Sequence, residues 1–402
     1  MVHSRVAIMP VKTVLICGAG IAGPAFAYWL SRYGFEPTLI ERAPAFRDGG
    51  YMIDVWGLGY DLVARYGLLD KARERAYIFD RLKFVDVGGR KLAGFGGDIF
   101  REAAGNKFFS IPRGDLAHTL YDPIAGKVET LYGTALRDIR EDGAGVEVVF
   151  TTGATRRFDL VVGADGLRSQ LRETFFGPEK MYEAYLGYYA VSFVAERYSH
   201  RDENVYVSFA LPGRQIARYA MRDGRTAFLL VFASSQKIAA HDRAAQTAVL
   251  RAQFGKDGWE TPEILARLDA ASDLYFDSVS QIRMPKWTQG RIALIGDAAH
   301  SPSLLAGAGA AFAMLGAYVL AGELKKAGGE HEAAFAAYEK RLMPFMQRQQ
   351  KAAVGFAASF APKTEFGLSL RNAVVRLMNI RPLGLWFTRR MLGEPYAIPT
   401  YD

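Results

Sequence analysis

The stretch Val14-Leu15-Ile16-Cys17-Gly18-Ala19-Gly20-Ile21-Ala22-Gly23 decides the fold of this 402-residue chain. The residues Val11 to Ile16 are rich in apolar and β-branched side chains, which is typical of a buried parallel strand. Pro24 to Tyr33 is apolar and compatible with a helix, and Gly34 can close that helix in a left-handed cap. Glu36 to Ile40 predicts a second short strand, so the segment forms a βαβ unit.

The glycines of this turn stand where a dinucleotide-binding loop needs them. Gly18 permits the tight turn, Gly20 lets the backbone approach a pyrophosphate, and Gly23 lets the helix pack closely on the strand. With Ile21 and Ala22 they bring the amino end of the helix, its free N–H groups and its positive dipole end to the phosphates. A purely structural turn is the alternative, and the flanking strand and helix disfavour it.

Charged residues follow the second strand. Glu41 ends it, 23 residues after Gly18. A carboxylate there accepts hydrogen bonds from ribose hydroxyls, which favours an adenosine without a 2′-phosphate. We expect Arg42 in the same cofactor site. Arg47 is a candidate for steering nucleotide phosphates or the flavin, and a solvated surface charge explains it equally well.

Two later segments share one pattern: an apolar strand, a small residue, an aspartate and an expected helix start. The first runs from Asp159 to Gly166 and is followed by Leu167-Arg168-Ser169 and Arg172. The second runs from Arg291 to His300. Carboxylates at the carboxyl ends of such strands point into the crevice where doubly wound sheets bind ligands. We therefore expect Asp165 and Asp297 at a ligand site, although either alone is also compatible with a helix cap.

Composition excludes several classes of protein. Half of the residues are hydrophobic and 23% are charged, as in globular proteins. Fifty basic against 42 acidic residues give a net charge of +8, which suits anionic ligands. No long Lys/Arg block or zinc-finger spacing supports nucleic-acid binding, and no metal-ligand motif is present. The single Cys17 excludes an internal disulfide and, with no signal-peptide pattern, indicates a cytoplasmic setting.

One segment is long enough to cross a bilayer. Ser301 to Gly322 contains no charged residue. Its residues are mainly Ala and Gly and it includes Pro302, which favours a buried helix that packs closely against a sheet or a cofactor. The sequence therefore predicts no membrane span.

The three motifs, in this order and at these separations, resemble those of the single-component FAD-dependent aromatic monooxygenases of the para-hydroxybenzoate hydroxylase type. The resemblance covers nearly the whole chain. Within that family the chain looks closest to the tetracycline-inactivating monooxygenases and their relatives. This closer likeness is carried by Gly49-Gly50 with Asp54, Gly258 to Thr261, Trp287 to Ala299 and Leu320 to Lys326.

The resemblance implies a set of FAD contacts. The glycine loop and Glu41 would hold the ADP half, Asp297 would bind the ribitol, and the segment around Asp165 is associated with both FAD and the nicotinamide nucleotide. An Arg-x-x-Leu element of the family brings an arginine to FAD, and Arg113 matches that arginine. A short loop of the family lines the isoalloxazine, and it is matched by Gly307, Ala308 and Gly309.

The resemblance also implies the reaction. NADH or NADPH would reduce FAD, and O₂ would give a flavin C4a-hydroperoxide that transfers one oxygen to an aromatic or polyketide-like small molecule. The cofactor carries the hard step, so we assign no catalytic residue. His300 and His118 are candidate bases for a phenolic proton, with a structural role as the alternative.

The chain departs from the family near the flavin. Ser303-Leu304 stands where members usually have Pro-Pro, and Gly307 to Ala311 lacks the usual Gln and Asn. Two alternatives therefore stay open: an FAD-dependent reductase or dehydrogenase without productive oxygen transfer, and a flavin-bound protein that sequesters a small molecule.

The pattern and the resemblance together predict an α/β plus β fold. A Rossmann-like, discontinuous FAD-binding domain would comprise residues 1–75, 101–180 and 286–355. A substrate domain on a mostly antiparallel sheet would comprise 76–100 and 181–285, and a C-terminal helical segment 356–402. We expect a monomer or a homodimer. Candidate substrate residues are Asp54, Tyr189, Phe193, Tyr206 and Phe228, although ordinary sheet core also explains the aromatic ones.

The C-terminal segment repeats apolar residues at helical spacing, interleaved with arginines. By family likeness this helix would brace the two domains, whereas a basic amphipathic helix would instead touch a membrane surface. The apolar residues are Leu370, Val374, Leu377 and Met378, and the basic ones are Arg371, Arg376 and Arg381.

Overall fold

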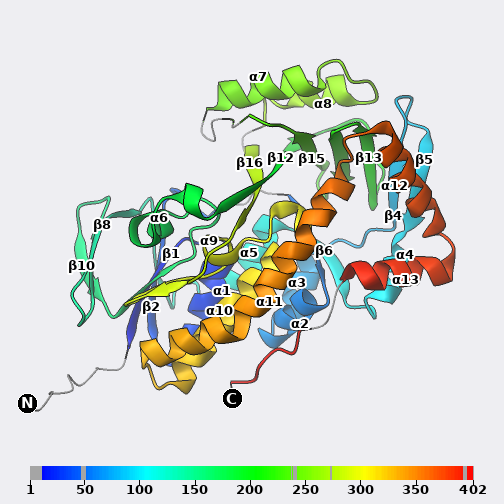
Figure 1. Cartoon of the computed structure of the whole chain (residues 1–402). Coiled ribbons are helices and arrows are strands. Elements are labelled where there is room, and N and C mark those ends of the chain that lie inside the picture. Colours follow the sequence, from blue (N-terminus) through cyan, green and yellow to red (C-terminus); the bar gives the residue numbers. More distant parts are fainter. Residues whose placement is uncertain are drawn as a thin grey trace, which may run out of the picture.

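The computed structural model of the chain is shown in Figure 1. It describes residues 11–46, 51–236, 238, 242–271, 274–392 and 396–401, without the side chains of 356–358. Arg47 and Gly49-Gly50, which the sequence singles out, lie outside the described residues.

The predicted βαβ unit is confirmed at the amino end. It consists of β1 (Thr13–Cys17), α1 (Ala22–Arg32) and β2 (Glu36–Glu41), and Gly34 closes the helix with a φ of +85°. The two strands pair in parallel, because the helical crossover returns the chain in the same direction. The predicted buried strand therefore lies in the middle of a sheet.

That sheet has six strands in the order β17-β18-β11-β1-β2-β7, all parallel where they pair except β17. Parallel strands are buried on both faces, which is why Val14, Leu15 and Ile16 are fully buried. The remaining strands of this sheet are β7 (Glu129–Tyr132), β11 (Leu160–Gly163), β17 (Thr288–Gln289) and β18 (Ile292–Leu294).

Two small sheets are separate from the six-stranded one. A hairpin at Asp142-Gly143 joins β8 to β9 in the first, and β3 pairs with β6 in the second. Their strands are β8 (Leu136–Glu141), β9 (Val146–Phe150), β10 (Thr155–Phe158), β3 (Met52–Trp56) and β6 (Phe108–Pro112).

A seven-stranded sheet forms the other half of the molecule, in the order β16-β12-β15-β14-β13-β4-β5 (Figure 1). Its pairings are antiparallel except between β13 and β4, as the mostly antiparallel prediction requires. The strands are β4 (Arg81–Val85), β5 (Lys91–Gly96), β12 (Glu183–Glu196), β13 (Val205–Leu211), β14 (Arg214–Ala220), β15 (Arg225–Ala233) and β16 (Leu274–Ile282). The exact domain boundaries stay a prediction.

Helices cover both halves. The first group is α2 (Leu58–Arg65), α3 (Leu69–Arg75), α4 (Gly97–Ala103), α5 (Arg113–Tyr121), α6 (Gln170–Phe176), η1 (Glu179–Met181), α7 (Arg243–Phe254) and α8 (Thr261–Arg267). The second is α9 (Asp297–His300), η2 (Leu304–Ala306), α10 (Gly309–Lys326), α11 (His331–Phe360), α12 (Glu365–Leu377) and α13 (Arg381–Leu392).

The helical part of the uncharged segment that begins at Ser301 is mostly buried, as predicted. It supplies α10, which packs against α1, α2 and α11, and its residues Phe312 to Leu324 are buried. Among the described residues, no helix is long and apolar enough to cross a membrane.

A charged cluster fastens α8 to the outer face of the seven-stranded sheet. The buried guanidinium of Arg218 on β14 donates two hydrogen bonds to Glu260, at 2.6 and 2.9 Å, and one to Asp202 at 3.0 Å. The Tyr198 hydroxyl donates a further one to Glu260 at 2.9 Å. The carboxylate of Glu260 therefore neutralises a charge that has little access to water.

Glu260→Ala is expected to lower the free energy of unfolding by about 3 kcal/mol, because removing one partner leaves a buried charge only partly compensated. Asp269→Ala is the control, since it breaks the exposed Arg251–Asp269 pair and is expected to cost less than about 1 kcal/mol. Urea unfolding of both variants measures the difference. Equal losses in the two would contradict a special role for the buried cluster.

Candidate active site

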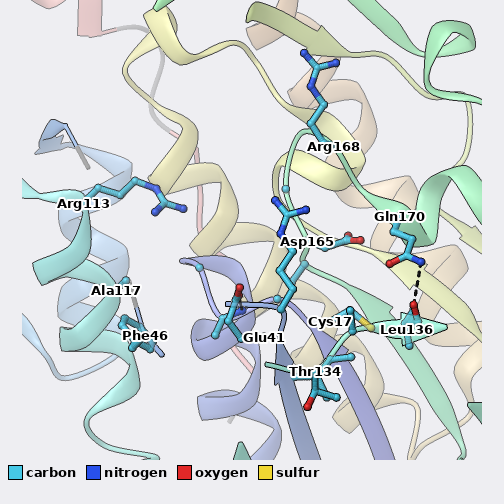
Figure 2. Close-up of a pocket in the computed structure, with 18 residues that line it drawn as sticks. Cys17, Glu41, Phe46, Arg113, Ala117, Thr134, Leu136, Asp165, Arg168 and Gln170 are labelled. Carbon is cyan, nitrogen blue, oxygen red and sulfur yellow. Dashed lines mark hydrogen bonds between the residues drawn. The ribbon is translucent and has the colours of Figure 1, made fainter. Parts of the chain in front are cut away.

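A pocket lies at the carboxyl ends of β1, β2 and β11, where a doubly wound sheet is expected to bind ligands (Figure 2). It gathers residues from the glycine loop, from the end of β2, from α5 and from the segment after β11. Its lining comprises Cys17, Gly18, Ala19, Gly20, Ile40, Glu41, Arg42, Phe46, Arg113, Ala117, Thr134, Ala135, Leu136, Ala164, Asp165, Gly166, Arg168 and Gln170.

The glycine loop has the geometry that its sequence predicts. Gly18 has a φ of +108°, and a Cβ there would lie 2.6 Å from the Ala164 carbonyl oxygen. A Cβ on Gly23 would lie 1.9 Å from the Gly18 oxygen, so only glycine lets α1 approach the loop. Gly20 instead faces open space, with only an Arg113 nitrogen 3.2 Å from its Cβ position. No side chain caps the amino end of α1 at Ile21.

Glu41 has a second task that sequence reasoning missed. One carboxylate oxygen accepts a hydrogen bond from the Ala19 N–H and the other from the Ala43 N–H, each at 2.9 Å. The side chain thus ties the glycine loop to the end of β2 while it lines the pocket. Each oxygen retains a further lone pair for a ligand hydroxyl.

Asp165 lies across the pocket from Glu41. One of its oxygens accepts a hydrogen bond from the Leu171 N–H at 3.2 Å, so the residue does help to cap α6. The other oxygen is buried and has no hydrogen-bond partner among the described residues. Burial raises the pKa of the carboxyl. A buried, unpartnered acceptor beside a pocket indicates a place for a ligand donor.

Arg168 links this segment to the seven-stranded sheet. It donates hydrogen bonds to Asp277 at 3.0 Å and to Ser278 at 2.8 Å, and it forms ion pairs with Glu179 and Glu183. One side of the pocket is therefore fixed to β12 and β16 by charge-assisted bonds.

Arg113 lines the pocket, and Asp297 continues the site beyond it. Asp297 begins α9 and is accessible to solvent, yet the surrounding protein desolvates its carboxyl enough to raise the pKa, an effect that Arg113 opposes. A Cβ on Gly309 would lie 3.9 Å from an Asp297 oxygen. Neither a capping side chain nor an acidic residue occupies the first turn of α10. The amino ends of α1 and α10, which no side chain caps, therefore both favour negative charge on a ligand in this site.

A polar group in aromatic surroundings adjoins the start of α10. Asp54 on β3 accepts a hydrogen bond from the Ser110 hydroxyl and is hydrogen-bonded to Tyr206 of β13. Burial raises the pKa of Asp54 to about 6, although both hydrogen bonds lower it. Trp56, two residues along the same strand, lies 3.1 Å from the Cβ position of Gly307. Through these contacts, β3 lies between the seven-stranded sheet and the turn Gly307–Gly309.

The other aromatic candidates lie elsewhere. Tyr189, Phe193 and Phe228 belong to a buried cluster with Phe254 of α7, whereas Tyr206 packs in a separate cluster. Because successive strand residues point to opposite faces of a sheet, these three side chains share the face that α7 and α8 cover, and they form core there. This placement favours the sheet-core alternative that the sequence left open, and we leave these residues out of the proposed substrate site.

Sequence reasoning also missed part of the pocket. Phe46, Thr134, Leu136 and Gln170 line it but belong to no motif. Gln170 donates a hydrogen bond to the Leu136 carbonyl at 3.0 Å, which Figure 2 shows as a dashed line. Only the pairing of β7 with β2 brings Thr134 near the glycine loop, and no local pattern reports that contact.

The two histidines have different surroundings. His118 packs against Phe46, with ring centroids 4.5 Å apart and the ring planes tilted by 40°. His300 is buried against Trp287, and neither of its ring nitrogens has a hydrogen-bond partner among the described residues. Burial lowers the pKa of His300 to about 4, so the ring is neutral in the folded protein near neutral pH.

The lowered pKa of His300 makes a prediction about acid stability. Below the unfolded pKa of about 6.5 the unfolded chain binds a proton that the native ring refuses, so stability falls until the pH reaches the folded pKa. His300→Leu is expected to reduce the loss between pH 7 and 4.5 by about 2–3 kcal/mol. Urea unfolding of both proteins at the two pH values measures it. Identical losses would contradict a neutral buried ring.

Comparisons with known proteins agree with this geometry. Residues 12–353 match the model of a family described as FAD binding domain. The chain is 38% identical over 351 residues to an uncharacterised protein of Mycobacterium tuberculosis, covering 84% of this chain and 92% of that protein. It is 36% identical over 369 residues to a flavin-dependent monooxygenase of Legionella longbeachae, covering 88% and 90%. The crystal structure of the tetracycline destructase Tet(51) superposes with a TM-score of 0.83 at 31% identity, covering 97% and 100%.

The chain belongs to this FAD-binding domain family. Within it, the chain is of the flavin-dependent monooxygenase class, so the resemblance predicted from the three motifs and the predicted enzyme class are both confirmed.

Proposed function

We propose that the enzyme uses NADH or NADPH and O₂ to hydroxylate a planar aromatic or polyketide-like compound. The observation that carries the proposal is the Asp54–Tyr206 pair, which lies in aromatic surroundings beside Trp56 and the Gly307–Gly309 turn. An apolar site with a few convergent polar groups is what such a ligand needs.

The residues present fit FAD. The open side of Gly20 and the uncapped end of α1 suit a pyrophosphate. Glu41, Arg42 and Asp165 would hold the ADP half, and the unpartnered oxygen of Asp165 is the kind of acceptor that a bound group satisfies.

The flavin end would be held by Arg113, Asp297 and the turn Gly307-Ala308-Gly309. The free amino end of α10 favours negative charge on a ligand placed there. FAD, when bound, supplies electron transfer and the activation of O₂.

The chain's own residues bind, orient and move protons. Trp56 and Tyr206 would contact the planar substrate, and the ionised Asp54 would accept the proton of a phenolic hydroxyl. Withdrawing that proton makes the ring more electron-rich. The neutral, buried His300 has no role in this step.

Product analysis tests the proposal. Purified protein with bound FAD is reduced anaerobically by NADH or NADPH with and without candidate aromatics, then exposed to ¹⁸O₂. Reduction that a ligand accelerates, followed by ¹⁸O in the product, is the expected result. Hydrogen peroxide as the sole product with every compound would favour the reductase suggested by the altered Ser303–Ala311 segment. Tight ligand binding without stimulated oxidation would favour the sequestering protein.

The setting of the enzyme is part of the proposal. Its one cysteine, Cys17, is buried, and burial raises the pKa of the thiol. A thiol that is neither paired nor reactive suits a reducing compartment, which supports a cytoplasmic location. A small-molecule substrate requires no partner protein, so a monomer or a homodimer would suffice.

A further inference from the structure

The two C-terminal helices carry apolar side chains on the face that points away from the protein. Seven of the twelve large hydrophobic residues that are exposed in the described part of the chain lie between residues 366 and 391. We call these seven the α12–α13 patch: Phe366, Leu370, Leu377, Ile380, Leu383, Trp386 and Met391. Phe366 is 78% exposed and Trp386 is 57% exposed.

Three residues of the patch form a stripe along α12. At 100° per residue, Phe366, Leu370 and Leu377 fall within an arc of about 40°. The opposite face is also apolar, and its residues Leu368, Val375 and Met378 are buried against the protein. Of the predicted apolar run, Leu370 and Leu377 therefore face solvent, and the bracing role of the helix stays a prediction. An amphipathic helix needs only one apolar face to fold onto a protein.

The packing of the two helices leaves the patch on the outside of the molecule. α12 contacts β5 and β13, and α13 contacts α4. Figure 1 shows both helices at one edge of the molecule, with α12 beside β5 and α13 beside α4. No element in the described part of the chain covers the exposed stripe.

The two helices are basic in sequence, and one of their arginines, Arg381, is paired with Glu102 of α4. Between residues 363 and 392 there are six basic residues and one acidic residue, Glu365. Arg389 and Arg390 are exposed on α13, and the Arg390 guanidinium lies 6.0 Å from the Trp386 ring centroid. A symmetric contact between two copies would bring these arginines together with little acidic charge to neutralise them. An apolar stripe with Trp and Phe at its ends and a basic rim instead suits an anionic lipid surface.

We propose that the α12–α13 patch docks the enzyme peripherally on membranes that contain anionic lipids. The apolar side chains would enter the interface while the arginines bind lipid phosphates. This inference is independent of the proposed substrate, because it rests on the outer faces of α12 and α13.

Vesicle sedimentation of the full-length, FAD-loaded protein tests it. We expect binding to phosphatidylcholine vesicles that contain phosphatidylglycerol, weaker binding at high salt, and little binding to pure phosphatidylcholine. The double variant Arg389→Gln/Arg390→Gln is expected to lower the partition coefficient about thirtyfold, since each arginine contributes to the attraction. Phe366→Ser/Trp386→Ser should lower it at least about tenfold.

Met181→Ser is the matched control, because Met181 is 65% exposed but lies on η1, outside the patch. It should bind vesicles like the original protein, and all variants should keep their FAD content and thermal midpoint. Absence of binding to the anionic vesicles at low salt would overturn the proposal. A second outcome would also overturn it: the protein is a dimer in sedimentation equilibrium, Leu370→Ser/Leu377→Ser dissociates the dimer, and neither form binds vesicles. The patch would then join two copies of the chain.

Discussion

Gly20→Val is expected to leave a folded chain whose dissociation constant for FAD rises at least about 100-fold. The Cβ position of Gly20 meets only the flexible end of Arg113, so valine need not disturb the protein itself. It would, however, fill the side of the loop from which a pyrophosphate approaches the backbone. Flavin fluorescence titration measures the affinity, and circular dichroism measures the fold.

Two further glycine variants separate binding from folding. Gly355→Val, on α11, is the control, since nothing lies within 4 Å of its Cβ position. It should bind FAD with unchanged affinity. Gly23→Ala should lose stability as well as FAD, because its Cβ would lie 1.9 Å from a backbone oxygen. Unchanged FAD affinity in Gly20→Val would show that the pyrophosphate does not approach this loop.

The glycine loop could be predicted because its determinants are local. Gly18 and Gly23 contact each other across one turn, and the strand and helix around them are visible as hydrophobic patterns. The same holds for the aspartates that follow β11 and β18, since each ends its own strand. Contiguous sequence therefore specifies the fold class and the nucleotide end of the site.

The substrate end could be predicted only in part, because it depends on contacts between distant segments. Asp54 and Tyr206 belong to strands far apart in the chain, and nothing local in either strand reports the other. Alternation along β12 shows that Tyr189 and Phe193 share a face, but not which face meets α7. In α12 both faces are apolar, so periodicity alone does not tell the buried residues from the exposed ones.

The residue on which the chemistry of the substrate end depends most is Asp54. If its carboxylate accepts a substrate proton, ligand-stimulated NADH or NADPH oxidation should rise with pH around the pKa of about 6 and fall below it, where Asp54 is protonated. Asp54→Asn is expected to lower kcat/KM at least about 100-fold and to remove this acid limb. Initial rates between about pH 5 and 8, with FAD saturating, measure both effects.

Two neighbours distinguish a proton acceptor from a structural carboxylate. Ser110 and Tyr206 donate hydrogen bonds that lower the pKa of Asp54, so Ser110→Ala and Tyr206→Phe should each raise it and move the acid limb to higher pH. Their rates should approach the original value once the pH exceeds the new pKa. A purely structural role would instead reduce the rate equally at every pH and leave the limb in place. Asp54→Asn with an intact rate and an intact limb would refute the assignment, because an amide cannot accept the proton and the titrating group would then lie elsewhere.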